Sequence, residues 1–464
     1  MTAPTRRPAR TRLAESMLAA RDADAVHAWL ARTAEHSWMN VERVPLDDLA
    51  GWLTEPGTGN LRHHTGRFFS VESLAVDLPG ALVPHWSQPI INQPEIGILG
   101  ILVREVDGVL HCLMQAKHEP GNANGLQLSP TVQATRSNYT RVHQGKPIPY
   151  LEHFRDTSGH HVLVDIRQSE QGAWFYRKRN RNMVVEVDGD VEVREGFRWF
   201  TLGEIAGLMT VPDLVNMDAR TVLACLPGGG AALAAAATDP FSEALVRSGD
   251  PATPGVHTTG EVLSWITEVR TRTDLRVALG PLAGLPDWRR ENGVIAHRSG
   301  GFFTVVGVDV RAGGREVGAW SQPMIEPVGT GVIAFLVKEI GGVLHVLTHA
   351  RTEPGYADVT ELAPTVQCVP EAHDHLPARP RFLDEVLGST KIRFDAVLSE
   401  EGGRFLGARN RYLVVETDAE VARDDPEYRW LTLHQYEELL RHSFYVNIQA
   451  RSLLLCLRSL LPRG

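Results

Sequence analysis

The clearest pattern along the chain is a pair of short apolar runs, rich in β-branched residues, separated by two turn-forming residues. Residues 97–106 and 109–118 flank an Asp-Gly pair, and Asp-Gly between two such runs is a strong signal for a β-hairpin. The same arrangement returns at 331–352, where the turn is Gly-Gly. The sequence therefore predicts two long hairpins.

Other predicted elements also occur in pairs. The pairs are a strand (MVVEVDGDVEV at 183–193, LVVETDAEV at 413–421), a turn into a helix (198–209, 429–440) and a closing helix (218–226, 449–457). Strands and helices of this kind predict an α+β fold, with mixed or antiparallel sheets that carry helices at their flanks.

These pairs belong to one long repeat. Matching phrases, such as WSQP at 86–89 and 320–323, follow one another in the same order at an offset of 234 residues, which shortens slightly further on. This order indicates gene duplication of a domain-sized unit. We expect a disordered arm at 1–22, a first module at 23–226, a linker rich in Gly, Ala, Pro and Thr at 227–260, and a second module at 261–464.

Charge and composition exclude several classes of protein. The net charge of −9 and the pI near 6.1 argue against a nucleic-acid surface. No run of 18 or more apolar residues is present, and the arginine-containing start lacks the apolar stretch of an export signal, so a cytoplasmic protein is expected. The four cysteines have no CxxC spacing, and neither a Walker A nor a Rossmann motif occurs.

Four polar phrases recur in both units where strands are expected to end: WSQP, EPG, PTVQ and RNR. For any one of them a structural role is the simpler interpretation, because Pro and Gly set turns and amide side chains satisfy buried backbone groups. The four together favour a ligand site. The two copies diverge directly after PTVQ, at 134–143 and 368–377, which predicts that the two pockets differ.

The chemistry of these phrases suits a sugar nucleotide. Arginines make bidentate phosphate contacts, aromatic rings stack on a base or sugar, and amides bind hydroxyls. Arg136, Arg141, Arg179 and Arg181 are the candidates for a diphosphate, and Trp86, Trp320 and Tyr139 for stacking. The candidate substrate-binding residues are Trp86, Ser87, Gln88, Asn122, Asn124, Gln127, Thr131, Gln133, Arg136, Ser137, Asn138, Arg141, Arg179 and Arg181.

Taken together, these phrases resemble the NDP-hexose 2,3-dehydratases of deoxysugar biosynthesis. The resemblance lies in WSQPII, in KHEPGNANGLQLSPTVQATRSNYTRVHQG and in the matching WSQP, EPG and LAPTVQ of the second unit. The resemblance covers the chain after its first twenty or so residues. It implies two Nudix-like modules per subunit, a homodimer, and a substrate such as dTDP-4-keto-6-deoxy-D-glucose. Water is then lost across C2 and C3 in the first step of 2-deoxygenation, in pathways such as antibiotic biosynthesis. A separate 3-ketoreductase would capture the unstable product.

The sequence departs from Nudix hydrolases at one decisive motif. Their metal-binding REUxEE box is missing after EPG in both units, so no metal and no metal-dependent pyrophosphate cleavage is expected. Elimination next to a C4 ketone needs a base at C3 and an acid at the C2 hydroxyl, with no redox cofactor. Glu119 with His118 is the first candidate acid/base pair, Tyr139 is a second acid, and Lys117 or Gln133 would polarise the ketone.

Which module is catalytic is open at this stage. The first is favoured because it has more hydrogen-bond donors after PTVQ. The candidates for a second pocket, catalytic or merely structural, are Trp320, Glu353, Thr365, Gln367, Arg409 and Arg411. Two alternative functions remain: a nucleotide-sugar pyrophosphatase of Nudix type, and a non-catalytic sugar-nucleotide binding protein.

Overall fold

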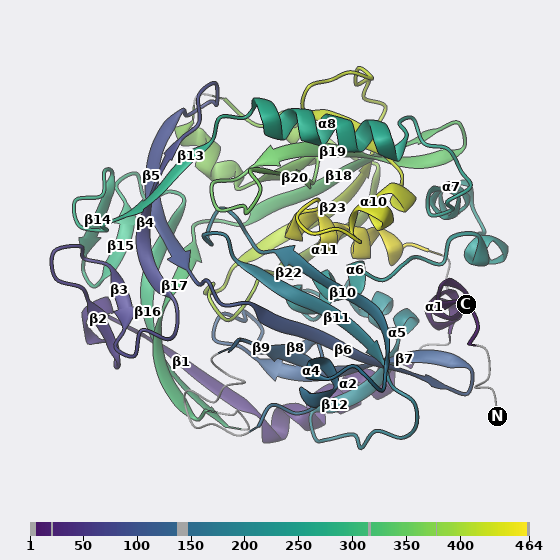
Figure 1. The fold of residues 1–464 in the computed structure, drawn as a ribbon, viewed down its shortest axis with the longest axis horizontal. Helices are drawn as coiled ribbons and strands as arrows, with labels where there is room; N and C mark the ends of the chain where they lie inside the picture. Colours follow the sequence, from purple (N-terminus) through teal and green to yellow (C-terminus); the bar gives the residue numbers. More distant parts are fainter. Residues whose placement is uncertain (1–5, 20–21, 137–146, 314–316, 377, 462–464) are drawn as a thin grey trace.

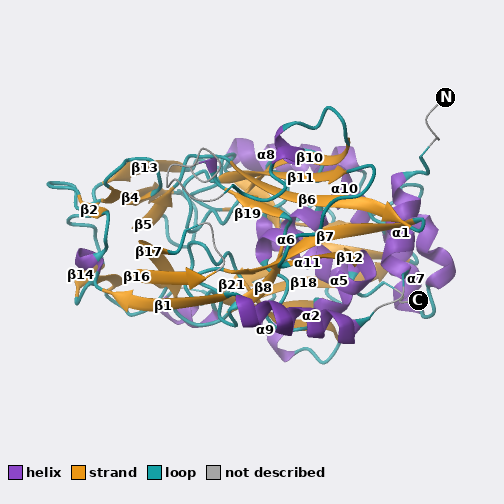
Figure 2. Cartoon of the chain, turned by 90° about the horizontal axis from the view of Figure 1, so that it is seen from below, coloured by secondary structure: helices purple, strands orange, loops and turns teal. Residues whose placement is uncertain are grey.

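The fold places two seven-stranded sheets beside two five-stranded sheets, with helices around the larger pair (Figure 1). The computed structural model describes residues 6–19, 22–136, 147–313, 317–376 and 378–461. The five-stranded sheets form two facing layers at one end of the molecule (Figure 2). The protein is thus α+β with mixed sheets, as the sequence predicts.

The first seven-stranded sheet has the order β10-β11-β6-β7-β12, with β8 on β7 and β9 on β6. Its strands are β6 (Gly97–Val106), β7 (Val109–His118), β8 (Leu126–Ser129), β9 (Val132–Ala134), β10 (His161–Ser169), β11 (Arg179–Glu186) and β12 (Phe197–Thr201). The β11–β6 pair is parallel and the other pairs are antiparallel.

The second seven-stranded sheet repeats this order strand for strand. The equivalent strands, in the same sequence, are β18 (Gly331–Ile340), β19 (Val343–Thr352), β20 (Thr360–Ala363), β21 (Val366–Cys368), β22 (Ile392–Ser399), β23 (Arg409–Glu416) and β24 (Tyr428–Leu431). The β18–β23 pair is again the parallel one.

The two predicted hairpins are confirmed, and their turns explain the sequence signal. Asp107 and Gly108 both have positive φ, at 50° and 83°, and Gly341 and Gly342 have φ of 61° and 79°. Two consecutive positive φ values belong to the tight turn whose twist matches paired strands, and Gly or Asp tolerates them best. The turns therefore fix the register of β6 on β7 and of β18 on β19.

The five-stranded sheets exchange strands between the two halves of the chain. One contains β1 (Trp38–Val44), β14 (Trp288–Glu291), β15 (Val294–His297), β16 (Phe303–Gly313) and β17 (Ala319–Pro327). The other contains β2 (Trp52–Thr54), β3 (Leu61–His63), β4 (Ser70–Asp77), β5 (His85–Asn92) and β13 (Arg276–Gly280). Because β1 pairs with β16 and β13 with β4, the two halves are interlocked at this end.

Helices pack the two seven-stranded sheets into one core. They are α1 (Ala9–Leu18), α2 (Ala23–His36), α4 (Glu152–Arg155), α5 (Leu202–Leu208), α6 (Met217–Ala224), α7 (Pro240–Ser248), α8 (Thr259–Arg272), α9 (Leu383–Gly388), α10 (Leu433–Leu439) and α11 (Ile448–Arg458). Short 3₁₀ turns lie at Leu46–Asp48, Gly230–Ala236 and Pro370–His375. The equivalent helices α6 and α11 pack on each other, and one apolar cluster includes residues of both halves.

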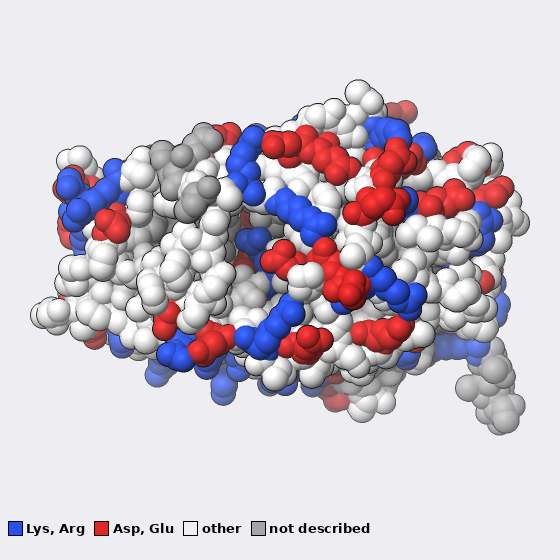
Figure 3. All heavy atoms as spheres, turned by 90° about the horizontal axis from the view of Figure 1, so that it is seen from above, with Lys and Arg blue, Asp and Glu red and all other residues white. Residues whose placement is uncertain are grey.

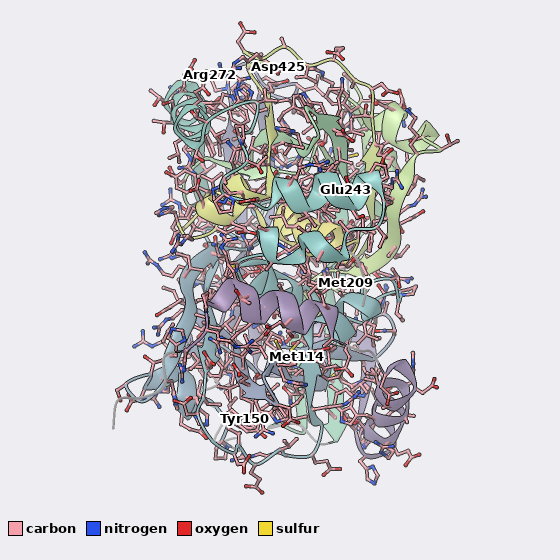
Figure 4. The ribbon with its side chains drawn as sticks, turned by 90° about the vertical axis from the view of Figure 1, so that its right-hand side faces the viewer. Met114, Tyr150, Met209, Glu243, Arg272 and Asp425 are labelled. Carbon is pink, nitrogen blue, oxygen red and sulfur yellow. The ribbon has the colours of Figure 1, made fainter. Side chains whose placement is uncertain are left out.

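Figure 4 shows the two halves stacked, with Tyr150 and Met114 in the half of the first sheet and Glu243, Arg272 and Asp425 in the other. None of the described helices is long and apolar enough to cross a membrane.

Two expectations about unstructured segments differ from the structure. Residues 9–18, expected in a disordered arm, form α1, whose Arg12 is buried against Glu186 and whose Ser16 donates to the carbonyl of Leu110 at 2.6 Å. Within the expected linker, residues 240–248 form α7, because Asp239 and Ser242 cap it and Leu245 is buried in the core. In both segments tertiary contacts outweigh a weak local pattern.

Candidate active site

A chamber of about 540 Å³ lies where the ends of β7 and β9 meet the five-stranded sheets. Its floor is formed by residues of the first seven-stranded sheet, and its walls by both five-stranded sheets and by residues 401–404 of the second half. On the face drawn in Figure 3, acidic and basic side chains are interspersed and form no continuous basic surface.

Glu119 is the centre of a hydrogen-bonded group on the chamber floor. Gln133 donates from Nε2 to Glu119 Oε1 at 2.9 Å, and Lys117 Nζ donates to Gln133 Oε1 at 3.1 Å. Lys117 Nζ also lies 3.5 Å from Glu119 Oε1. Lys117 is on β7 and Gln133 on β9, and both strands pair with β6. Three predicted residues, Lys117, Glu119 and Gln133, are thus brought together.

Three further ionisable groups of the first half line the chamber: Glu170, Lys178 and Asp218. Asn180 donates to Glu170 Oε1 at 2.7 Å, and Lys178 Nζ donates to the carbonyl of Glu95 at 2.6 Å. Burial lowers the pKa of Lys178 to about 8 and raises the pKa of Glu170. Burial, reinforced by nearby carboxylates, raises the pKa of Asp218 well above its usual range.

The second half contributes Glu401 and Arg404 to the same chamber. Both side chains come from the loop that follows β22. Burial and the neighbouring Glu119 raise the pKa of Glu401 to about 7. Arg404 Nε donates to Gln93 Oε1 at 3.2 Å, and its guanidinium carbon lies 4.3 Å from the ring centre of Phe69. The chamber therefore needs both halves of the chain.

Aromatic side chains form the outer wall. Trp52 comes from β2, His63 from β3, Phe68 and Phe69 from the residues just before β4, and Trp320 from β17. His63 packs edge-on against Phe68 with ring centres 4.6 Å apart. Flat aromatic surfaces beside buried charges suit a ligand that has both a ring and a phosphate.

Several predicted residues lie elsewhere. His118 points to the opposite side of β7, where its Nε2 is 3.2 Å from the carbonyl oxygen of Ser37, because neighbouring strand residues alternate in direction. Arg181 makes two 2.6 Å hydrogen bonds to Asp165, and Arg179 Nη1 donates to the carbonyl of Arg177. Asn180, between these two arginines, is the member of RNR that lines the chamber.

The remaining residues of the prediction have structural contacts. Thr131 donates to the carbonyl of Leu113 and accepts from the backbone N–H of Leu102, which ties β6 to β7. Asn122 donates to the carbonyl of Gly125 and Asn124 to the carbonyl of Asp213. Gln127 donates to Asn124 and accepts from the hydroxyl of Ser399. Arg136 is exposed and is not among the residues that line the chamber. Ser137, Asn138, Tyr139 and Arg141 lie outside the described residues.

The WSQP phrase that lines the chamber is the one from the second half of the chain. Trp320, expected in a second pocket, lines the chamber with Ser321 and Gln322. Trp86, Ser87 and Gln88 do not line it; Gln88 donates to the carbonyl of Ala173 at 2.6 Å. The physical reason is the exchange of strands between the halves. β1 of the first half pairs with β16, and β16 pairs with β17, so β17 lies beside elements of the first half.

The equivalent position in the second half has different chemistry. Arg351 Nε donates to Glu353 Oε1 at 2.8 Å, and Gln367 Nε2 donates to the same oxygen at 3.1 Å. Where the chamber has Lys178, Asp218, Glu401 and Arg404, the repeat has Ala408, Gln449, Gln171 and Trp174. Thr365 ties β18 to β19, Arg409 pairs with Asp213, and Arg411 pairs with Asp395. Four ionisable groups are therefore absent from the second site.

Sequence reasoning missed Glu170, Lys178, Asp218, Glu401 and Arg404. Four of these five differ between the repeats at aligned positions, and this divergence was the available signal. No group of three or more His, Cys, Asp or Glu side chains within the described ranges is arranged to hold a metal ion.

Comparison with known proteins matches the same two halves of the chain. The family model described as NDP-hexose 2,3-dehydratase matches residues 23–226 and 259–457. The chain is 49% identical to a dTDP-4-dehydro-6-deoxy-alpha-D-glucopyranose 2,3-dehydratase of Saccharopolyspora spinosa, over 94% of this chain and 92% of the relative. Proteins of the same description from Amycolatopsis orientalis and Streptomyces violaceoruber are each 47% identical, over 95% and 96% of this chain and 91% and 98% of theirs.

Among solved structures, a chain described as an ADP compounds hydrolase aligns with a TM-score of 0.24 and 18% identity, covering 34% of this chain and 84% of its own. The family model and the relatives cover nearly all of the sequence, and the chain therefore belongs to the NDP-hexose 2,3-dehydratase family.

Proposed function

We propose that the protein removes water across C2 and C3 of dTDP-4-keto-6-deoxy-D-glucose, and that the chamber around Glu119 is the active site. The observation that carries the assignment of the site is the difference between the two halves. Four ionisable groups surround Glu119 in the chamber, and Ala408, Gln449, Gln171 and Trp174 replace them around Glu353. Proton transfer needs ionisable groups, so the first site is the working one.

In this proposal Glu119 removes the proton from C3, which the C4 ketone makes acidic. The ammonium of Lys117 and the amide of Gln133 hold Oε1 of Glu119, so its second oxygen is the one directed to substrate. Positive charge near the C4 oxygen stabilises the enolate that forms, and Lys117 is the group placed to supply it. The chemistry needs no redox cofactor, since the sugar is neither oxidised nor reduced overall.

Arg404 is the arginine of the chamber wall that we assign to the diphosphate. Its guanidinium lies over Phe69 at the wall of the chamber, whereas Arg181 is engaged by Asp165 outside it. The planar fork of arginine suits phosphate oxygens. The base would then stack against the aromatic wall that includes Trp52 and Trp320.

The wider expectations from the family resemblance are part of the same proposal. We propose that the halves are Nudix-like modules from a gene duplication, which the identical strand order of the two seven-stranded sheets supports. The protein would act in the cytoplasm as a homodimer, in deoxysugar and antibiotic biosynthesis. It would pass its product to a 3-ketoreductase. Light scattering on the purified protein tests the dimer directly.

The decisive experiment is incubation of the purified protein with dTDP-4-keto-6-deoxyglucose, with and without a 3-ketoreductase and NADPH. We expect loss of substrate in both arms and a stable 2-deoxy product only when the reductase is present. Release of dTMP that stops when EDTA is added would instead identify a metal-dependent pyrophosphatase. Binding without any loss of the C3 proton would identify a binding protein.

A further inference from the structure

Glu401 is a buried carboxyl group at the chamber wall that the proposed function does not yet use. It is the residue after Glu400 in the loop between β22 and β23 of the second half. Its Oε1 accepts a hydrogen bond from the backbone N–H of Gly403 at 2.8 Å. Its Oε2 is buried and has no hydrogen-bond partner among the described residues. One oxygen is therefore fixed by the loop and the other is left for a ligand.

The loop that carries Glu401 is held against the turn that carries Glu119. The backbone N–H of Gly121, in that turn, donates to the carbonyl of Gly402 at 2.7 Å, and Gly407 donates back to Gly121 at 2.9 Å. A Cβ atom at Gly402 would lie only 3.0 Å from Cβ of Glu119. The two carboxyl-bearing segments therefore approach each other as closely as backbone permits.

The other contacts of this loop also fix its position. Gln322 donates to the carbonyl of Gly403 at 2.6 Å, and the buried guanidinium of Arg220 donates to the carbonyl of Ser399 at 2.6 Å. These donors come from β17 and α6. Glu401 is thus part of a preorganised wall, which is what an acid that acts on a bound substrate requires.

Charge separates the roles of the two carboxyl groups. The charged residues that face Glu401 are Glu119, Glu170, Lys178, Asp218 and Arg404. Glu119 accepts a hydrogen bond from Gln133 and lies beside Lys117. Burial and the neighbouring Glu119 raise the pKa of Glu401 to about 7, so that Glu401 holds a proton near neutral pH. A carboxylic acid that holds its proton, beside a second carboxyl group that can accept one, is the arrangement that a paired acid and base need.

We propose that Glu401 is the general acid that protonates the departing C2 hydroxyl, so that the two halves of the chain each supply one member of the catalytic pair. The inference rests on the proposed dehydration. The C3–H bond breaks and its proton passes to Glu119, giving the C3–C4 enolate. The C4 carbonyl then re-forms, the C2–C3 double bond forms, and the C2–O bond breaks. The proton of Glu401 joins the leaving oxygen as water, and the enol product tautomerises to the 3,4-diketone.

The second half contains a natural comparison. Gln171 occupies the position of Glu401, and its Nε2 donates to Glu400 Oε2 at 3.0 Å. An amide has no proton to give to a leaving hydroxyl group. The site around Glu353 therefore lacks an equivalent of this acid, as it lacks equivalents of Lys178, Asp218 and Arg404.

The test is Glu401→Gln, assayed for two steps separately, with Glu119→Gln for comparison and Glu353→Gln as the matched control. In D₂O we expect E401Q to exchange the C3 proton of the substrate within about threefold of wild type while dehydration falls by about 10²–10³-fold. E119Q should lose both exchange and dehydration, and E353Q should lose neither. The fall in kcat above about pH 7 in wild type should be absent from the remaining activity of E401Q.

Glu401→Asp keeps the acid and should recover part of the dehydration, which separates proton donation from a structural role. If E401Q does not fold, the dependence of kcat on pH in E401D decides. A fall in kcat at alkaline pH with the same midpoint as in wild type would overturn the assignment. Dehydration by E401Q at the wild-type rate, or equal loss of exchange and dehydration, would also overturn it. A wild-type protein that does not dehydrate the substrate would instead disprove the proposed function itself.

Discussion

Gln133 donates a hydrogen bond from Nε2 to Oε1 of Glu119 at 2.9 Å, which joins the last residue of PTVQ to the first residue of EPG. The same bond exists in the second half, from Gln367 to Glu353 at 3.1 Å. The recurring phrases are therefore two parts of one hydrogen-bonded unit. What distinguishes the halves is the set of charges around that unit.

Removal of the carboxylate should affect the two halves differently. Glu119→Gln keeps the shape of the side chain but removes the base, so we expect kcat to fall by about 10³-fold. Glu353→Gln makes the same change where Ala408 and Gln171 replace ionisable groups, and its kcat should stay within about threefold of wild type. Steady-state rates of dehydration, coupled to a 3-ketoreductase, measure both. Loss of activity in E353Q alone would assign catalysis to the second half.

The duplicated tryptophans provide a matched pair for substrate binding. Trp320 lines the chamber and Trp86 does not, yet each indole N–H donates to a glutamine two residues on, at 3.1 Å and 3.0 Å. Trp320→Ala should raise KM by about tenfold through loss of aromatic contact, whereas Trp86→Ala should leave KM nearly unchanged. Equal effects of the two substitutions on KM would contradict the assignment of Trp320, and not Trp86, to the substrate site.

The sequence predicted the parts of the fold that local patterns determine. Asp107–Gly108 and Gly341–Gly342 specify their hairpins because the turn itself demands positive φ. The turn-to-helix segments could be predicted because Thr201 and Thr432 each form a capping box with the residue three positions later.

The pairing of β1 with β16 could not be read from the sequence in the same way. It joins residues more than 250 positions apart, and the apolar pattern of a strand does not identify the strand with which it pairs. The chamber was predicted only in part for this reason: Glu119 and Gln133 belong to one half, but Trp320, Glu401 and Arg404 reach it from the other. The error at RNR has a simpler cause. Alternation along β11 turns Asn180 inward and both arginines away from the chamber.

Two equivalent buried arginines should differ in their effect on catalysis. Arg220 donates to the carbonyl of Ser399, next to the loop of Glu401, and Arg451 donates to the carbonyl of Ser169 at the same 2.6 Å. Replacing either with Met leaves buried carbonyl groups unpaired and should lower the free energy of unfolding by about 2–4 kcal/mol. Arg220→Met should also lower kcat, because the loop that forms the chamber wall loses its anchor.

Urea unfolding curves and steady-state rates on the same samples measure both effects. Arg451→Met is the comparison: Ser169 leads to Gln171 of the second site but also adjoins Glu170 of the chamber, so its kcat should fall less than that of Arg220→Met. If both variants lost stability and activity in equal proportion, Arg220 would have no separate influence on the catalytic loop.

The stability of the protein should depend on pH through Glu401. Its pKa is raised from 4.5 to about 7 by burial and by Glu119, so the folded protein holds this proton more tightly than the unfolded chain. The resulting stabilisation is complete below about pH 4.5 and is lost as the pH rises through 7. Glu401→Gln has no proton to lose, so between pH 5 and pH 8 its free energy of unfolding should gain about 2–3 kcal/mol relative to wild type. Urea unfolding at the two pH values tests this, with the exposed Glu268→Gln as control. A difference between E401Q and wild type that did not change from pH 5 to pH 8 would show that Glu401 is already ionised at pH 5, and the acid role would then be untenable.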